Sequence, residues 1–297
     1  MTLPATLALP LPVQGLSWTV VGAVLLGALL HASWNALVKS SADKDLDMVT
    51  LHLMGSLIAL PLLATVGWPA AAAWPFIAGS VTLHLGYYLT LSGAYRHGDL
   101  GLTYPLMRGV APLLVALSAS ALLGETLTPL AWVGVWGVSL GVLVLGLTRQ
   151  ALAAPRAVAF ALTNAAIIAC YTVVDGQGVR ANQAAGGHAL QYVAALFLLH
   201  GWPFAALKLA QRKGAVLPYV RQRWPVGALG AAASLGSYGI ALWAMTHAPV
   251  ATVAALRETS VLFALVLSTW LLKEKISMRR VLGACTLLAG VMALRLG

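Results

Sequence analysis

The sequence predicts an all-α polytopic membrane protein: ten transmembrane helices, forming two inverted five-helix repeats around a central cavity. Composition is the first observation behind this prediction. Of the 297 residues, 60% are hydrophobic and 9% are charged, whereas about 25% are charged in a soluble domain. Apolar runs of roughly 20 residues recur along the chain, and each can cross a hydrocarbon core of ~30 Å as a helix.

An internal repeat is the second observation. The segment 94–147 returns in altered form at 244–296, and each copy has one arginine inside an apolar run, Arg108 or Arg257. At the same distance after each arginine comes a glutamate, Glu125 or Glu274, for which an ion pair or a helix cap is expected. Glycines recur in register and predict close helix packing: Gly86 with Gly236, Gly134 with Gly283, and Gly141 with Gly290.

Both repeats are expected to contain five helices. The first repeat covers 16–147, a linker covers 148–156, and the second repeat covers 157–296. The ten spans are expected at 16–38, 48–66, 74–95, 102–123, 130–147, 157–174, 188–207, 225–245, 250–272 and 279–296. An odd number of helices per repeat makes the second copy enter the membrane from the opposite side, as in many secondary transporters.

The lysines and arginines are distributed unevenly over the predicted loops. Most follow odd-numbered spans, whereas the opposite loops hold only Arg180 and Arg295. The positive-inside rule places the odd-numbered loops in the cytoplasm and both termini outside. The polar stretch from Asp175 to Asn182 is expected to be a loop on the outer side.

The arginines within the spans are the leading candidates for substrate contact, because a charge at membrane depth is costly and faces the bundle interior. Arg108 is the first choice to hold an acidic group, and Arg257 the second. The alternative is an internal ion pair, which adjacent Glu258 makes plausible for Arg257.

Few titratable groups accompany these arginines in the predicted spans. Glu258 is expected to be the only acidic residue well inside a span, either as a proton-coupling carboxylate or as a fixed counter-ion. His31 and His84 are further candidates for proton coupling, with hydrogen-bonded packing as the alternative. No pair of His or Cys residues has metal-ligand spacing.

Polar and aromatic side chains within the spans could line a substrate site. Plain helix packing is the alternative for each of them. The candidates are Trp34, Asn35, His84, Tyr88, Tyr104, Tyr171, Tyr238 and Trp243.

Other functional classes lack support. Phosphate-binding, zinc-protease and serine-hydrolase motifs are absent, so neither an enzyme nor a cofactor is expected. The basic residues occupy short loops without interleaved aromatics, which argues against nucleic-acid binding. A channel would need a continuous polar stripe, whereas these polar residues cluster at mid-depth.

The doubled unit, with HASWNALVK in the first span and LLGETLTP and LLKEKIS before the fifth and tenth spans, resembles the drug/metabolite transporter superfamily, EamA type. The resemblance implies ten helices around a central cavity and export of metabolites, including aromatic and hydrophobic amino acids. It also implies that both termini are cytoplasmic, which disagrees with the charge count.

Together these features predict a multi-pass inner-membrane exporter of small metabolites that works by alternating access. The expected substrates are amino acids with apolar or aromatic side chains, and the alternative is a phosphonate or another small organic anion. The expected partners are this substrate and the lipid bilayer. The sequence is compatible with a monomer.

Overall fold

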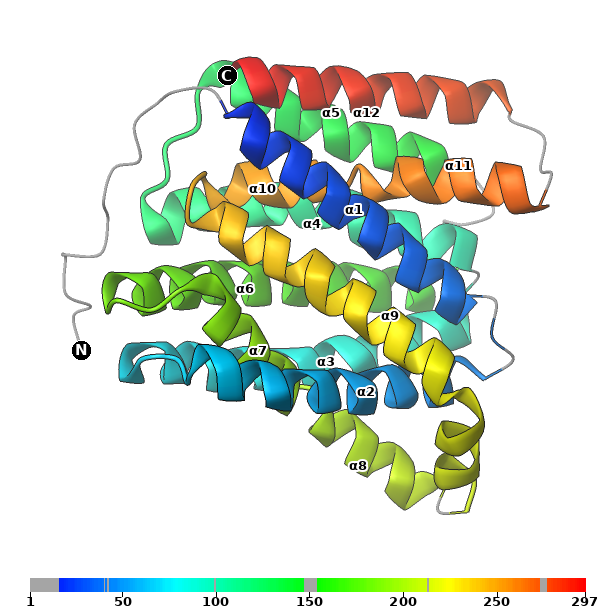
Figure 1. The fold of residues 1–297 in the computed structure, drawn as a ribbon. Coiled ribbons are helices and arrows are strands. Elements are labelled where there is room, and N and C mark those ends of the chain that lie inside the picture. Colours follow the sequence, from blue (N-terminus) through cyan, green and yellow to red (C-terminus); the bar gives the residue numbers. More distant parts are fainter. Residues whose placement is uncertain are drawn as a thin grey trace.

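The computed structural model describes residues 16–39, 41, 43–98, 100–146, 154–212, 214–272 and 277–297. Its elements are helical throughout this part of the chain (Figure 1). In order they are α1 (Trp18–Lys39), α2 (Lys44–Val66), the 3₁₀ turn η1 (Ala71–Ala73), α3 (Trp74–His97), α4 (Leu100–Leu123), α5 (Pro129–Gly146), α6 (Pro155–Ala184), α7 (Ala189–Leu199), α8 (Trp202–Gln211), α9 (Val216–Met245), α10 (Val250–Arg257), α11 (Ser260–Leu272) and α12 (Met278–Leu296).

The number of long helical stretches confirms the prediction of ten. Within the described residues, α7 and α8 together form one interrupted stretch, as do α10 and α11. Eight of the ten stretches are long and apolar enough to span a membrane by length and composition. The other two are α3 and α12, and α12 has charges at both ends (Arg279, Arg280 and Arg295).

Two predicted spans contain a break that apolar patterning does not reveal. The seventh is interrupted at His200 and Gly201. The helix resumes at Trp202, and Pro203 lies in the first turn of α8. A proline is suited to the start of a helix and not to its interior. The ninth is interrupted at Glu258 and Thr259.

The backbone around the second break changes its hydrogen-bonding pattern. The amides of Glu258 and Thr259 each donate to the carbonyl three residues earlier, at N–O distances of 3.1 Å. This tighter 3₁₀-type spacing is common where an α-helix is interrupted at a functional site. Arg257 is therefore the last residue of α10.

One prediction about the sixth span was wrong. The polar stretch from Asp175 to Asn182 is not a loop, because α6 continues as helix as far as Ala184. Asp175 and Asn182 are both buried. Hydrogen bonds to other parts of the chain satisfy these side chains, from Tyr192 and Tyr238 to Asp175 and from the amide of Ala70 to Asn182. The helix can therefore continue through polar residues. The fourth span also stays helical, through Pro105 and Pro112.

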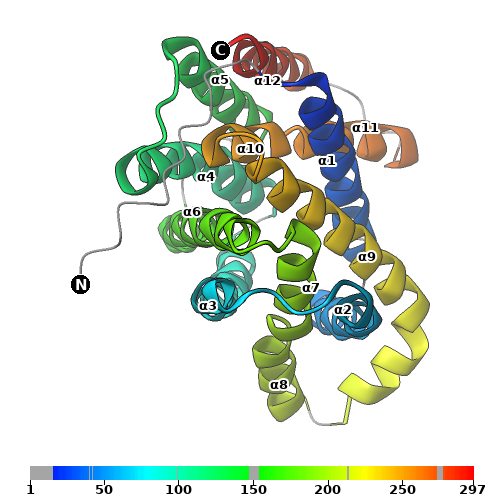
Figure 2. The ribbon, with the colours of Figure 1, turned by 60° about the vertical axis from the view of Figure 1, so that its left-hand side comes forward.

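A glycine seam joins α5 to α12 at one side of the bundle, opposite α8 (Figure 2). A Cβ atom at Gly137 would lie 2.9 Å from the Cα of Gly290, and one at Gly141 would lie 2.8 Å from the carbonyl oxygen of Gly283. The seam confirms the close packing predicted for the glycines of these two helices, a device by which membrane helices approach each other. Gly86 and Gly236 have looser surroundings, with the nearest side-chain atoms at 3.4 and 3.3 Å.

Candidate functional site

A central cavity with two adjoining lobes lies between the helices. The mouth lobe extends from Arg108 to Lys44 and Asp45 at the start of α2. The inner lobe lies beside Arg257, with residues from the α7–α8 break in its wall. Both lobes are lined by His31, Trp34, Met48, Tyr87 and Tyr88.

Most of the residues predicted for the site meet in this cavity. The mouth lobe is lined by His31, Trp34, Asn35, Tyr88, Tyr104 and Arg108. The inner lobe is lined by His31, Trp34, His84, Tyr88, Tyr171, Tyr238 and Arg257.

Two of the predicted residues line neither lobe. Trp243 lies near the end of α9, where its ring is 4.6 Å from that of His247, centroid to centroid. Glu258 lies behind the cavity wall, beside Arg108.

Arg108 is neutralised within the protein. Its Nε atom is 2.8 Å from Oε2 of Glu258, and its NH2 group donates to the hydroxyl of Ser260 at 3.2 Å. The side chains of the pair are 9% and 5% exposed. Of the alternatives set out for these residues, an internal ion pair is the arrangement observed, and it uses Arg108 and not the neighbouring Arg257.

Arg257 has no such carboxylate. Its guanidinium carbon lies 5.2 Å from the centre of the Tyr238 ring, a cation–π geometry. Within the described part of the chain, no carboxylate forms an ion pair with Arg257. Among the described residues, Arg257 at the end of α10 is thus the cavity arginine that forms no direct ion pair with a carboxylate.

Stacked rings form the wall beside this arginine. The rings of His84 and Tyr171 are 4.4 Å apart and inclined by 27°, while Tyr238 lies 6.3 Å from His84. Tyr88 contacts the same group from the next turn of α3, at 6.3 Å from His84. Such a wall suits a flat or apolar ligand body.

Several buried polar atoms of cavity-lining residues lack a partner in the described chain. They are Nε1 of Trp34, Oδ1 of Asn164 and both ring nitrogens of His52. The amide nitrogen of Asn164 is already used, since it donates to the carbonyl of Tyr87 at 2.9 Å and to the hydroxyl of Thr90 at 2.8 Å. A buried polar group without a partner costs free energy. A ligand that forms hydrogen bonds with these atoms would remove that cost.

His52 and Asn164 were missed as site residues by sequence reasoning. Each is a single polar residue within an apolar run, which is the signal that identified His31 and His84. Within the described residues, no group of three or more His, Cys, Asp or Glu side chains could hold a metal ion.

Asp175 corrects the prediction that Glu258 is the only acidic residue well inside a span. Asp175 on α6 is fully buried and accepts a hydrogen bond from the hydroxyl of Tyr192 at 2.8 Å. The hydroxyl of Tyr238 donates to its other oxygen. Asp175 thereby fixes the ring on which Arg257 lies.

Comparisons with known proteins identify the kind of molecule. Residues 155–296 match the model of the EamA-like transporter family. The second half of the chain is therefore similar to EamA-like transporters. A solved structure titled "Crystal structure of protein" aligns with a TM-score of 0.71 at 19% identity, over 92% of this chain and 98% of that chain, which shows the shared fold. No curated protein matches.

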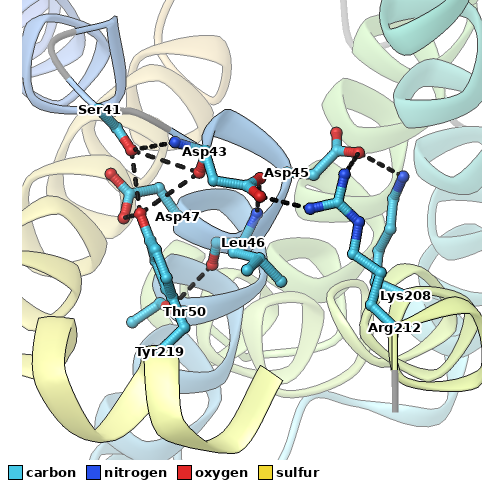
Figure 3. Close-up of polar contacts among 9 residues, drawn as sticks. All are labelled: Ser41, Asp43, Asp45, Leu46, Asp47, Thr50, Lys208, Arg212 and Tyr219. Carbon is cyan, nitrogen blue, oxygen red and sulfur yellow. Dashed lines mark hydrogen bonds and ion pairs between the residues drawn. The ribbon is translucent and has the colours of Figure 1, made fainter. Parts of the chain in front are cut away.

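By length and composition the protein is a multi-pass membrane protein, with eight candidate spans among the described residues. Its cavity lies between two charged clusters at opposite ends of the helices. The first, here the α2 cluster, joins the start of α2 to α8 and α9 (Figure 3). It consists of Asp43, Asp45 and Asp47 with Lys208, Arg212, Tyr219 and Arg223.

Direct contacts hold the α2 cluster together. The Nζ atom of Lys208 lies 2.6 Å from Asp45, and the hydroxyl of Tyr219 donates to Asp47 at 2.8 Å. Arg212 pairs with Asp43, whose carboxylate also caps α2 by accepting from the amide of Leu46 at 3.1 Å. Ion pairs of mixed burial therefore hold this end of the protein beside the mouth lobe, since Lys208 and Asp47 are buried whereas Arg212 is exposed.

The second cluster closes the opposite end. Glu125 accepts a hydrogen bond from the amide of Val250 at 3.0 Å and thereby caps α10, and its Oε1 lies 2.8 Å from NH1 of Arg180. Arg180 also donates to the carbonyls of Met245 and Ala248, at 2.8 and 3.1 Å. The role predicted for Glu125, an ion pair or a cap, is confirmed. Glu274 lies outside the described residues.

Proposed function

We propose that this transporter exports amino acids with apolar or aromatic side chains, and that Arg257 binds their carboxylate. The observation that carries the proposal is the position of Arg257, in the cavity, over Tyr238 and without an ion pair among the described residues. Arg257 is half-buried, and a charge at membrane depth is costly unless it is paired. A bound carboxylate would supply the missing partner.

The environment of Arg257 supports a flat or apolar substrate body. The rings of His84, Tyr171 and Tyr238 lie on one side of the inner lobe, and Trp34 lines both lobes. Arg108, the first choice from the sequence, is less suited to the substrate because Glu258 already neutralises it.

We infer the direction of transport from the charge distribution. The loop between α1 and α2 belongs to the lysine- and arginine-rich side, which the positive-inside rule places in the cytoplasm. The mouth lobe reaches Lys44 and Asp45 on that side, whereas the network of Glu125 and Arg180 holds the other end. Substrate would enter from the cytoplasm of a cell with this protein in its inner membrane. Export would follow when the two five-helix units, 16–147 and 157–296, rock against each other.

A phosphonate or another small organic anion is the second candidate. Arg257 would suit any oxyanion, and the Nε1 donor of Trp34, which has no partner in the described chain, could bind a further oxygen. An amino acid differs from these anions by its ammonium group, so direct comparison of substrates separates the two candidates.

Counterflow in proteoliposomes tests the proposal. Purified protein would exchange labelled L-tryptophan, L-phenylalanine and L-leucine, and phenylphosphonate would serve as the competing anion. Arg257→Gln should weaken binding by about ten- to a hundredfold, the worth of a charge-assisted hydrogen bond. Arg257→Lys should retain part of it.

Arg295→Gln is the matched control. Arg295 also lies over an aromatic ring, 4.8 Å from the centre of Trp18, but it lines neither lobe. Equal exchange by the wild type and Arg257→Gln would refute the carboxylate site. Exchange of labelled phenylphosphonate without exchange of any amino acid would favour the second candidate.

A further inference from the structure

Three histidines from separate parts of the chain meet in the inner lobe. His52 belongs to α2, His84 to α3, and His200 lies in the break between α7 and α8. The ring centroids of His52 and His200 are 5.0 Å apart, and those of His84 and His200 are 5.2 Å apart. All three side chains are more than nine-tenths buried. We call them the imidazole cluster.

Backbone contacts fix the hydrogen positions on two of these rings. Nδ1 of His84 lies 2.9 Å from the carbonyl oxygen of Ser80, and Nδ1 of His200 lies 2.9 Å from that of Leu196. A carbonyl oxygen can only accept, so each Nδ1 carries the hydrogen. In a neutral ring, Nε2 is then a lone-pair acceptor.

The third ring completes the cluster. Both nitrogens of His52 are buried and have no partner in the described chain. One of them is a lone-pair acceptor in the neutral ring. A Cβ atom at Gly201 would lie 2.5 Å from the Cβ of His52, so the helix break and its glycine are what let α2 approach. The cluster thus gathers three nitrogen acceptors beside Arg257.

We infer that the imidazole cluster binds either the ammonium group of the substrate or a proton, and never both. This inference rests on the proposed function, in which Arg257 binds the carboxylate of an amino acid. The ammonium and the proton are both cationic and require the same lone pairs. Binding of one therefore excludes the other, and the transporter exchanges an outgoing amino acid for an incoming proton.

The chemistry of the exchange is a simple proton transfer. A hydronium ion from water in the cavity gives its proton to an imidazole nitrogen, which leaves water and an imidazolium. When the substrate enters, the imidazolium returns the proton to water, and the freed lone pair accepts a hydrogen bond from the ammonium group.

The groups around the cluster favour single occupancy. Arg257 already contributes one positive charge to the inner lobe, and the tyrosines there are neutral donors, so a second and a third cation would repel each other. The titratable and charged groups nearest the cluster on the packed elements are His31 of α1, Tyr87 and Tyr88 of α3, Tyr171 and Asp175 of α6, Tyr192 of α7, Lys208 of α8, Tyr238 of α9 and Arg257 of α10.

Nitrogen-15 NMR of histidine-labelled protein in lipid nanodiscs tests proton binding without transport. As the pH is lowered from about 8 into the acidic range, signals of the cluster should change from neutral to imidazolium. At low pH, L-tryptophan should displace that proton. 3-(Indol-3-yl)propionate has the same ring and carboxylate but no ammonium group, and it should leave the imidazolium in place.

Proteoliposomes loaded with a pH-sensitive dye test the exchange itself. A gradient of L-tryptophan should drive protons in the opposite direction through the wild type. His200→Asn keeps a donor for the carbonyl of Leu196 but does not titrate, and it should lose proton movement. His97→Asn is the matched control, because exposed His97 makes the same contact, with the carbonyl of Gly93 at 2.9 Å.

Three results would overturn the inference. The first is the absence of any imidazolium in the cluster at the lowest pH at which the protein stays folded. The second is exchange of L-tryptophan without proton movement, or with movement that His200→Asn leaves intact. The third is equal displacement of the proton by both indole compounds. Imidazolium formation without exchange of any amino acid would instead refute the proposed function, and with it the ammonium half of the inference.

Discussion

Replacing Glu258 by Gln should destabilise the transporter strongly, because it leaves the charge of Arg108 buried without a counter-ion. At the observed separation of 2.8 Å, the attraction between the two charges is about 6 kcal/mol at an effective dielectric constant of about 20. The hydroxyl of Ser260, at 3.2 Å from Arg108, remains as a neutral partner. Loss of one member of a buried pair typically costs about 3–5 kcal/mol, and we expect a loss in that range.

Equilibrium unfolding in mixed detergent micelles, followed by tryptophan fluorescence, would measure this loss as a change in the free energy of unfolding. Arg108→Leu combined with Glu258→Leu should cost less than Glu258→Gln alone, because no charge is then left unpaired. Asp43→Asn is the control. It removes a charge from a pair whose side chains are 42% and 30% exposed, keeps a capping side chain, and should cost less than about 1 kcal/mol.

The reasoning would be refuted by a loss below about 1 kcal/mol for Glu258→Gln, because a pair of that strength behaves as an exposed one. Additive losses for the single Leu variants and the double Leu variant would refute it as well. Energetic coupling between two contacting side chains appears as a departure from additivity.

Gly141→Leu should separate α5 from α12 and lower the thermal stability in detergent, since its Cβ would lie 2.8 Å from a carbonyl oxygen of α12. Tyr238→Phe removes one donor from the carboxylate of Asp175 and should lower the free energy of unfolding by about 1.5–3 kcal/mol. Glu125→Ala removes the cap of α10 and its ion pair, so a cysteine placed at buried Ala248 should react faster with a membrane-impermeant maleimide.

Each of these predictions has a matched control. Gly22→Leu should be tolerated, because nothing lies within 4 Å of a Cβ atom at that position. Tyr219→Phe removes a donor from Asp47, which keeps Arg223 as a charged partner, and should cost less than Tyr238→Phe. Glu125→Gln keeps an acceptor for the cap but not the charge, so its effect on labelling should lie between those of the wild type and Glu125→Ala.

The sequence could predict the helices and many of the cavity residues because both leave local signals. An apolar run long enough to span a membrane is visible without knowledge of its neighbours. A polar side chain in such a run must find a partner or a cavity, which is how His84, Tyr171 and Arg257 were identified. The glycines of α5 and α12 were visible through their repetition.

The remaining features depend on contacts between distant parts of the chain. The sequence could not reveal which arginine Glu258 neutralises, because adjacent residues on a helix point in different directions and the partner is on α4. The local sequence shows no partner that could bury the carboxylate of Asp175, and it therefore predicts a loop there. Its donors, Tyr192 and Tyr238, lie on other helices. A role for His52 becomes apparent only when the structure places its ring in one cluster with His84 and His200.

The glycine seam between α5 and α12 lies in a part of the molecule that does not line the cavity. Within the described residues, no side chain of α5, α11 or α12 lines either lobe of the cavity. Substitutions in the cavity can therefore change the substrate without disturbing the glycine seam between α5 and α12. Chimeras that retain these three helices and exchange the cavity-lining residues of α1, α3, α6 and α9 should fold and acquire the substrate preference of the donor protein.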